Sequence, residues 1–464
     1  MNPVSEVTKI RRDIFTRIAR WALNQPLDGP FEMDISALVK EIIPDGPARY
    51  RCCIHKERAI VEEQIKIAVG LTPLNNPVTV IPDACNRCSL TKYLVTDVCQ
   101  NCVAHPCRNS CPKKAISVIQ NRAFIDQTSC AECGKCAKAC PYNAIIEITR
   151  PCERACAIGA IKVDESRKAV IDNSLCVSCG LCVTVCPFGA ITDLSQILDV
   201  ICSLRIKEQP HVAIVAPAIA GQFGPKVTPE QIKTGLLQLG FDEMVEAALG
   251  ADIVAKEEAH EIMEHVGQKN VMTNSCCPAF ANAVAVKMPE LKDKISTTLS
   301  PMRVTGQLVK DKYANKVTTV FIGPCIAKKA EATRGDEIDL VLTFEELAAI
   351  FSASGIDLSS LAPTEVKDAS PNGRLFARAG GVSAAVRKHI NSDMDLEILQ
   401  VQGLGQCLSA LKTAAKKVNG AGLTFIEGMA CEGGCVGGPG TIVTIAAGTR
   451  AVEKHAGESI ILPK

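Results

Sequence analysis

The chain has 464 residues and a formal net charge of +1, with 51 basic and 50 acidic residues interspersed along it. This balance gives no electrostatic reason to expect nucleic acid or an anionic membrane as a partner. No run of about 18 apolar residues occurs, and the N-terminus lacks the apolar core of a signal peptide, so we expect a soluble, cytoplasmic protein. The length predicts two or three domains.

Residues 1–80 carry no cluster motif and are predicted to form a helical N-terminal segment. Apolar residues recur at roughly helical spacing between Ile10 and Leu23, which predicts one buried stripe. A second helical pattern follows Cys52, Cys53 and His55. A metal role for this trio is one interpretation, but buried or idle thiols are the commoner case, and we assign the trio no function.

Residues 81–200 contain a fourfold repeat of cysteine motifs, such as CAECGKCAKACPYNAI at 130–145. In this pattern a C-x2-C-x2-C loop wraps three thiolates around one 4Fe-4S cubane, and the distant fourth cysteine, followed by proline, binds the neighbouring cluster. Zinc is a weaker interpretation because zinc ribbons use separated cysteine pairs. We therefore predict tandem α+β ferredoxin-like 4Fe-4S domains.

The cross-ligation rule sorts sixteen of these cysteines into four groups. The third repeat lacks its first two cysteines, and the pair just upstream could complete it in space; three clusters with that upstream pair unused is the alternative. The groups are Cys99, Cys102, Cys107 and Cys140; Cys130, Cys133, Cys136 and Cys111; Cys176, Cys179, Cys182 and Cys156; and Cys85, Cys88, Cys152 and Cys186.

Residues 205–464 alternate apolar runs with amphipathic helices, which is typical of an α/β domain. Three strand-like runs lead to Cys277, Cys325 and Cys431. Because ligands gather outside the carboxyl ends of strands in α/β sheets, we expect these cysteines to converge. Cys435 follows among glycines that let the backbone approach a bulky inorganic group, so the four could hold one more 4Fe-4S cluster. Two other cysteines, Cys202 and Cys407, are expected to be core thiols.

Three loops of this half closely resemble the signature loops of the iron-iron (FeFe) hydrogenases: TNSCCPAF, GPCIAKKAEA and EGMACEGGCVGGPG. The resemblance runs from about residue 210 to 440, and the cysteine repeats resemble the accessory electron relay of the family. It implies an α/β H-cluster domain of two lobes. It also implies that Cys277, Cys325, Cys431 and Cys435 hold the cubane of an H-cluster, whose two-iron subsite bears carbon monoxide, cyanide and an aza-dithiolate.

The resemblance also implies a proton path. Cys276 would face away from the cubane and exchange protons with the bridging amine, since the ordinary thiol pKa of about 8.5 lies near working pH. In the register of the family, Glu258, Ser296 and Glu261 match a relay of acid, hydroxyl and acid that leads outward. Glutamates on a helix face are otherwise most often merely solvated.

Two lysines follow Cys325 in the second loop. Lys328 matches the lysine that pairs with a cyanide in the family, and a cation suits an anionic ligand in a closed cavity. Lys329 is expected to be an exposed lysine on a polar turn, and Glu331 a structural partner for a basic group. Departures such as Phe280, where tryptophan is usual, would affect the tuning of the cluster and remove no ligand.

The implied activity is reversible interconversion of 2 H+ and 2 e− with H2, as in a ferredoxin-type hydrogenase. The implied partners are a soluble ferredoxin and the maturation enzymes of the two-iron subsite, with no role for nucleic acid or membrane. Residues 99 to 140 include six basic and two acidic residues, and this excess of positive charge would suit an acidic electron donor. Two alternatives stay open: a hydrogen- or redox-sensing regulator with an H-cluster, and a non-catalytic iron–sulfur carrier or assembly scaffold.

Overall fold

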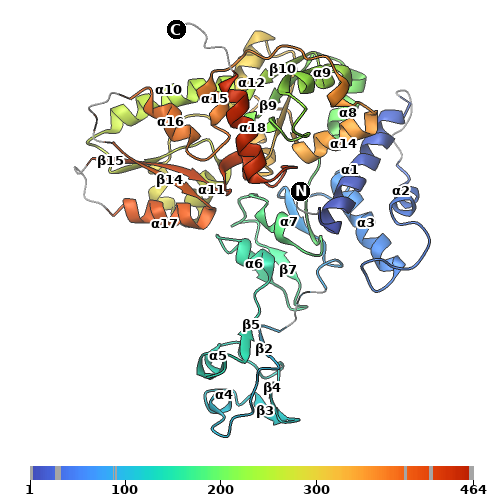
Figure 1. The fold of residues 1–464 in the computed structure, drawn as a ribbon, viewed down its shortest axis with the longest axis vertical. Helices are drawn as coiled ribbons and strands as arrows, with labels where there is room; N and C mark the ends of the chain where they lie inside the picture. The colour runs from blue at the N-terminus through green and yellow to red at the C-terminus, as the bar shows by residue number, and fades with distance from the viewer. Residues whose placement is uncertain are drawn as a thin grey trace.

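The structure is a computed structural model that describes residues 4–26, 33–86, 88, 91–390, 394, 396–416 and 422–458. An α/β body occupies the upper part of the view in Figure 1, and two small cysteine-rich units hang below it in a row. The N-terminal helices cover one side of the body. Across the described residues, no helix combines the length and the apolar character needed to span a bilayer.

Three helices form the N-terminal segment: α1 (Glu6–Asn24), α2 (Ile35–Ile42) and α3 (Ile54–Ala68). The Ser5 hydroxyl caps α1 by accepting the Thr8 N–H, and the predicted stripe buries Ile14 and Ile18. This stripe packs against α14 (Phe344–Ser354) and α8 (Ile197–Ile206) of the body. Three residues at the start of α3 are exposed, and their arrangement indicates no function: Cys52, Cys53 and His55.

The outer cysteine-rich unit consists of two hairpin-like strand pairs and two short helices. Its strands pair antiparallel, β2 with β5 and β3 with β4. Each short helix begins where a C-x2-C loop ends, so the repeat written in the sequence is also a repeat of structure. The elements are β2 (Tyr93–Val95), α4 (Pro106–Asn109), β3 (Ile116–Ile119), β4 (Arg122–Ile125), α5 (Lys135–Ala139) and β5 (Ile145–Glu147).

The inner unit repeats this plan and is closed by the chain just upstream of the repeats. Strand β1 (Val78–Val80) pairs antiparallel with β8 (Ile191–Asp193), which places Cys85 next to the last repeat. This pairing supplies the cysteines that the third repeat lacks. The other elements are α6 (Pro151–Ala155), β6 (Ile161–Val163), β7 (Ala169–Ile171) and α7 (Leu181–Val185).

The α/β body contains two parallel sheets, which agrees with the expected two lobes. The four-stranded sheet has the order β10-β9-β12-β13, and the three-stranded sheet the order β11-β15-β14. Strands β9, β12 and β15 are buried along their whole length, which explains their continuous apolar runs. The strands are β9 (His211–Val215), β10 (Glu243–Glu246), β11 (Val271–Thr273), β12 (Thr318–Gly323), β13 (Leu340–Thr343), β14 (Leu396–Gln402) and β15 (Leu423–Met429).

Helices cover both sheets of the body. The longest of them, α10, runs across the top in Figure 1 and packs against α12, α15 and α16. The remaining α-helices are α9 (Pro229–Leu239), α10 (Ala247–His265), α11 (Pro278–Lys287), α12 (Pro301–Lys312), α13 (Ala327–Ala332), α15 (Pro371–Leu375), α16 (Gly381–Arg387), α17 (Leu404–Ala414) and α18 (Ile445–Gly457), and the 3-10 turns are η1 (Pro217–Ile219), η2 (Pro289–Lys294), η3 (Leu358–Ser360) and η4 (Gly434–Gly437).

Lys329 is buried, so the expectation of an exposed lysine on a polar turn was wrong. Its Nζ lies 3.1 Å from Asp193 Oδ2 and 2.9 Å from Glu346 Oε1. Burial alone would lower the pKa of Lys329, but the two carboxylates outweigh it and hold the pKa above its ordinary value. A buried charge of this kind is tolerated only with its partners in place.

Replacement of Lys329 by Met should lower the free energy of unfolding by about 3–5 kcal/mol, because Asp193 and Glu346 would keep buried charges without their shared cation. Urea unfolding followed by circular dichroism and by the fluorescence of the single tryptophan, Trp21, measures this. Lys9→Met, which removes an exposed ion pair with Glu6, should leave the unfolding curve nearly unchanged. Equal curves for both variants would contradict the assignment.

Candidate metal centre and proton path

Four cysteines of the α/β body come together from three loops. Cys325 follows β12, Cys277 lies between β11 and α11, and Cys431 follows β15. Strand β12 belongs to the four-stranded sheet and the other two strands to the three-stranded sheet. The cysteines therefore meet between two sheets and not along the edge of one. The thiols of Cys325, Cys277 and Cys435 all lie close enough to Cys431 to raise its pKa.

The chemistry of this donor set fits a positively charged iron cluster. Burial, and then the neighbouring thiol of Cys277, raises the pKa of Cys325 to about 11. Burial and three neighbouring thiols hold the pKa of Cys431 well above its ordinary value. Four adjacent thiolates would repel one another unless a cation lies among them, and metal binding displaces their protons. The thiols thus suit a 4Fe-4S cubane, which takes one thiolate on each iron.

Backbone packing leaves this site little freedom. A Cβ on Gly434 would lie 2.7 Å from the Ala379 nitrogen, and one on Gly438 would lie 2.6 Å from the Pro324 oxygen. A side chain at position 434 would push the Cys435 loop away from residues 377–379, and one at position 438 would push it away from the loop that carries Cys325. The glycines of the third loop are therefore needed for close approach of backbone to backbone.

Cys276 lies beside this group, and its sulfur accepts a hydrogen bond. The Asn274 amide donates to Cys276 Sγ at 3.1 Å, and its Oδ1 accepts the Gly428 N–H at 2.7 Å, which fixes the amide orientation. Burial, and then the nearby Glu258, raises the pKa of Cys276 well above its ordinary value. The folded environment therefore moves the pKa of Cys276 upward from the ordinary thiol value, an effect of burial that a local sequence pattern does not reveal. Cys276 is thus held as a neutral thiol.

Two buried glutamates of α10 and a serine hydroxyl continue from Cys276. Glu258 is fully buried, and its Oε1 accepts the Ser275 N–H at 3.0 Å. Its Oε2 has no hydrogen-bond partner among the described residues. Next along the path, the Ser296 hydroxyl donates to Glu261 Oε2 at 2.6 Å. The default expectation of solvated helix glutamates fails here, since both side chains lie inside the body.

Burial raises the pKa of Glu258 to about 7, with a further rise from Glu261, while the hydrogen bond from the Ser275 N–H opposes the shift. A carboxyl group with this pKa can both take and release a proton near neutral pH. The free oxygen of Glu258 and its position between Cys276 and Ser296 give the carboxyl group the geometry of a proton carrier.

Lys328 lies close to Cys325 and Cys276. Its Nζ pairs with Glu331 Oε2 at 2.6 Å and also donates to the Cys276 carbonyl oxygen at 3.4 Å. Burial would lower the pKa of Lys328, but Glu331 outweighs it and raises the pKa. Lys328 is therefore a buried cation beside the cysteine group, held in place by Glu331.

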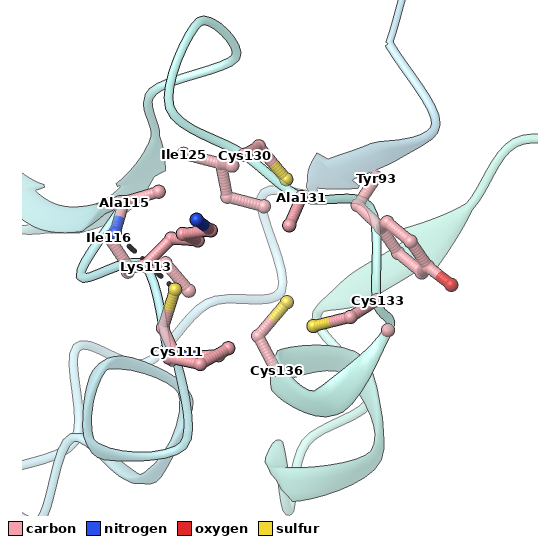
Figure 2. A pocket seen from close by; sticks show the side chains of 12 residues that line it. Tyr93, Cys111, Lys113, Ala115, Ile116, Ile125, Cys130, Ala131, Cys133 and Cys136 are labelled. Atoms are coloured by element: carbon pink, nitrogen blue, oxygen red, sulfur yellow. Dashed lines mark hydrogen bonds between the residues drawn. The ribbon is translucent and has the colours of Figure 1, made fainter.

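Figure 2 shows one of two hollows in the outer cysteine-rich unit, with four sulfur atoms pointing into it. The four belong to Cys111, Cys130, Cys133 and Cys136 and come from two different repeats. The second hollow is lined by Cys99, Cys102, Cys107 and Cys140. Both groupings match the cross-ligation rule.

The inner unit brings its cysteines together in the same manner. The thiol of Cys156 lies close enough to raise the pKa values of Cys176, Cys179 and Cys182. In the second group, Cys186, Cys88 and Cys85 all raise the pKa of Cys152, whose largest shift comes from burial. The two upstream cysteines thus lie at the incomplete repeat. Within the described residues, no three His, Cys, Asp or Glu side chains form a group that could hold a single metal ion.

In each repeat, the sulfur of the last cysteine accepts a hydrogen bond from a backbone N–H group. The donors are the N–H groups of the alanines four residues later, at 3.2 to 3.4 Å. This explains the Ala-Ile that ends each repeat, because the chain must turn tightly over its own sulfur. Such bonds raise the reduction potential of a bound cluster. The cysteines are Cys111, Cys140, Cys156 and Cys186.

Two residues near these groups were missed from the sequence. Asn274 precedes the doubled cysteine directly, and its position inside a signature loop was the available signal. His105 lines the outer hollow and has a φ of 42°, a left-handed conformation that the equivalent Gly134 also adopts. The signal for His105 was its place between the second and third cysteines of the first repeat.

The comparisons with known proteins agree with this arrangement. The family "Iron only hydrogenase large subunit, C-terminal domain" matches residues 209–439, and two 4Fe-4S binding domain families match 122–145 and 169–192. Iron hydrogenase 1 of Clostridium pasteurianum is 30% identical over 387 residues, which cover 71% of this chain and 67% of that protein. The NADP-reducing hydrogenase subunit HndD of Solidesulfovibrio fructosivorans is 29% identical, over 68% of this chain and 56% of that one.

More distant relatives include the cytosolic iron-sulfur assembly component 3 of Bos taurus, 24% identical over 48% of this chain and 59% of that protein. An FeFe-hydrogenase HydA1 structure from Chlamydomonas reinhardtii matches at 23% identity and a TM-score of 0.47, over 57% of this chain and 90% of that one. Fold and site together define an iron–sulfur protein with ferredoxin-like 4Fe-4S domains. More particularly, the chain belongs to the family of FeFe hydrogenases.

The carboxyl C=O infrared band of protonated Glu258 should disappear as pH rises, with a midpoint at about 7. The folded-state pKa lies above the ordinary 4.5, so the stability that the bound proton contributes is complete below the ordinary value and is lost as pH rises through about 7. Glu258→Gln should remove the band, whereas Glu257→Gln, on the exposed face of α10, should retain it. A midpoint near 4.5 would contradict the burial argument.

Proposed function

We propose that this protein is an FeFe hydrogenase that interconverts 2 H+ and 2 e− with H2. The observation that carries the proposal is the divided role of adjacent cysteines, in which Cys277 faces three other thiols while Cys276 leads to buried Glu258. Cys277, Cys325, Cys431 and Cys435 would hold the cubane of an H-cluster. When bound, the H-cluster supplies the redox centre at which protons and electrons combine.

The side chains of the body would move the protons. Cys276, a neutral thiol at rest, would hold the proton nearest the H-cluster and would be reprotonated from Glu258. Glu258 exchanges with Ser296, whose hydroxyl already donates to Glu261 at 2.6 Å. Glu261 is the last buried acid of the path. Lys328 supplies a fixed positive charge that suits a cyanide ligand.

The cysteine-rich units would carry the electrons through four accessory 4Fe-4S clusters. Support for the fourth is the proximity of Cys85, Cys88 and Cys186 to Cys152. The inner unit comes close to the body at Cys179, whose thiol lies near enough to Cys431 to raise its pKa. We assign electron transfer to residues 81–200 and hydrogen chemistry to residues 205–464.

A second candidate function is an iron–sulfur carrier or assembly scaffold, because relatives of the chain include cytosolic iron–sulfur assembly factors. Such a protein needs the cubane thiols but has no use for a proton path. The closeness of Cys276 to buried Glu258 and the hydrogen bond from Ser296 to Glu261 therefore favour the hydrogenase.

Replacement of Cys276 by Ala should lower H2 evolution from reduced viologen by at least about 100-fold, because proton transfer by a placed side chain contributes about 10²–10⁴-fold. Iron content should stay the same, since Cys276 binds no iron in this account. Cys202→Ala, a half-buried thiol on α8, is the matched control and should keep full activity. Retention of activity in Cys276→Ala would refute the proton path.

The electron partner would be an acidic ferredoxin that docks on the outer cysteine-rich unit. This unit is the part of the chain farthest from the body in Figure 1. Its exposed basic residues have no ion-pair partner among the described residues, so their positive field is not cancelled locally. These residues are Arg108, Lys113, Lys114, Lys135 and Lys138.

Electron transfer from reduced ferredoxin should slow as ionic strength rises, because salt screens the attraction between the two proteins. The double variant Lys113→Glu with Lys114→Glu should slow it about tenfold or more at low salt and little at high salt. Lys226→Glu, an exposed lysine of the body, is the control. A rate independent of salt in the parent would reject docking by charge.

A further inference from the structure

The N-terminal segment is the part of the chain whose role remains open. None of the three family matches reaches residues 1–80. Its first helix, α1, nevertheless packs against α14 and α8 of the body, and α3 contacts β8 of the inner cysteine-rich unit. The segment thus touches both the body and the inner unit.

A buried ion cluster joins the three parts. Arg11 of α1 donates to Asp193 Oδ1 at 2.6 Å and to Glu345 Oε2 at 3.2 Å. Asp193 ends β8 of the inner unit, and its other oxygen lies 3.1 Å from Lys329 Nζ. The side chain of Asp193 is 0% exposed and that of Lys329 is 2% exposed, so water does not weaken these contacts.

The ion cluster lies close in sequence to one cysteine of the inner unit and to one cysteine of the body. Asp193 comes seven residues after Cys186, and Lys329 comes four residues after Cys325. Arg51 of the N-terminal segment makes a second connection by donating to the Phe188 and Ala84 carbonyl oxygens at 2.6 and 3.4 Å. Both carbonyls belong to loops that carry cysteines of the inner unit.

The loop that carries Cys179 in the inner unit packs tightly against the loop that carries Cys325 in the body. A Cβ on Gly180, next to Cys179, would lie 2.7 Å from Ile326 Cδ1 and 2.9 Å from Pro439 Cγ. Ile326 follows Cys325 directly and is fully buried. A small slide of the inner unit would therefore change the distance between the two groups at once.

We infer that the N-terminal segment is a clamp that fixes the inner cysteine-rich unit against the Cys325 loop, with Arg11 as its main positioning residue. The clamp sets the spacing across which an electron passes between the last accessory cluster and the cubane of the body. The inference rests on the proposed function in one respect, since both cysteine groups must hold clusters. It adds a role for a segment that contains no cluster ligand.

The test uses the full chain with its 4Fe-4S clusters reconstituted and chemically reduced. Magnetic interaction between neighbouring reduced clusters splits their electron paramagnetic resonance lines and falls steeply with distance. Arg11→Gln should keep the iron content per chain and show a smaller or broader splitting. Arg11→Lys, which keeps the charge but cannot span both carboxylates, should fall between Arg11→Gln and the parent.

Arg17→Gln is the matched control, because Arg17 lies on the same helix and its ion-pair partners among the described residues, Asp13 and Glu41, both belong to the N-terminal segment. It should leave the splitting unchanged. Should Arg11→Gln fail to assemble its clusters, Arg51→Gln tests the second connection with the same readout. A parent-like splitting in the variant that assembles overturns the clamp. This readout needs only 4Fe-4S clusters, so it stands even if the parent evolves no hydrogen and the proposed function fails.

Discussion

The mutual repulsion of four thiolates gathered in one place is the constraint on which the rest of this structure depends. Three loops from two separate sheets place Cys277, Cys325, Cys431 and Cys435 together in a region where burial alone already disfavours the charged form. Only a strongly positive group can offset both costs. The parallel sheets, the glycine-rich loop and the tight contact with the inner unit all serve to hold this otherwise unfavourable arrangement.

The same burial determines what the neighbouring residues can do. One residue away from the metal-facing thiols, Cys276 stays protonated because burial and Glu258 both disfavour its thiolate. Glu258 in turn stays protonated up to about pH 7, with one oxygen free of any described partner. A low-dielectric interior thus favours the neutral forms of this thiol and this carboxyl group, and Lys328 keeps its charge there through Glu331.

Local patterns predicted much of this fold. The cysteine spacing predicted the groups found in both hollows, because the cross-ligation rule follows from the geometry of one short repeat. Continuous apolar runs predicted β9, β12 and β15. Contacts between distant residues were not predictable in this way. Lys329 was expected in solvent because its partner Asp193 lies 136 residues away, in a different unit. Similarly, the pKa of Cys276 depends on Glu258, on a helix that no local pattern places beside it.

Hydrogen chemistry requires that the cysteines of the body hold a six-iron centre and not a cubane alone. The infrared spectrum of the protein matured in its own host distinguishes the two. If the protein is a hydrogenase, the spectrum should contain carbonyl and cyanide stretching bands that disappear when Cys435 is replaced by Ala, while the accessory clusters remain. A protein with its full set of 4Fe-4S clusters and no such bands would rule out the hydrogenase and leave the assembly scaffold as the function of the chain.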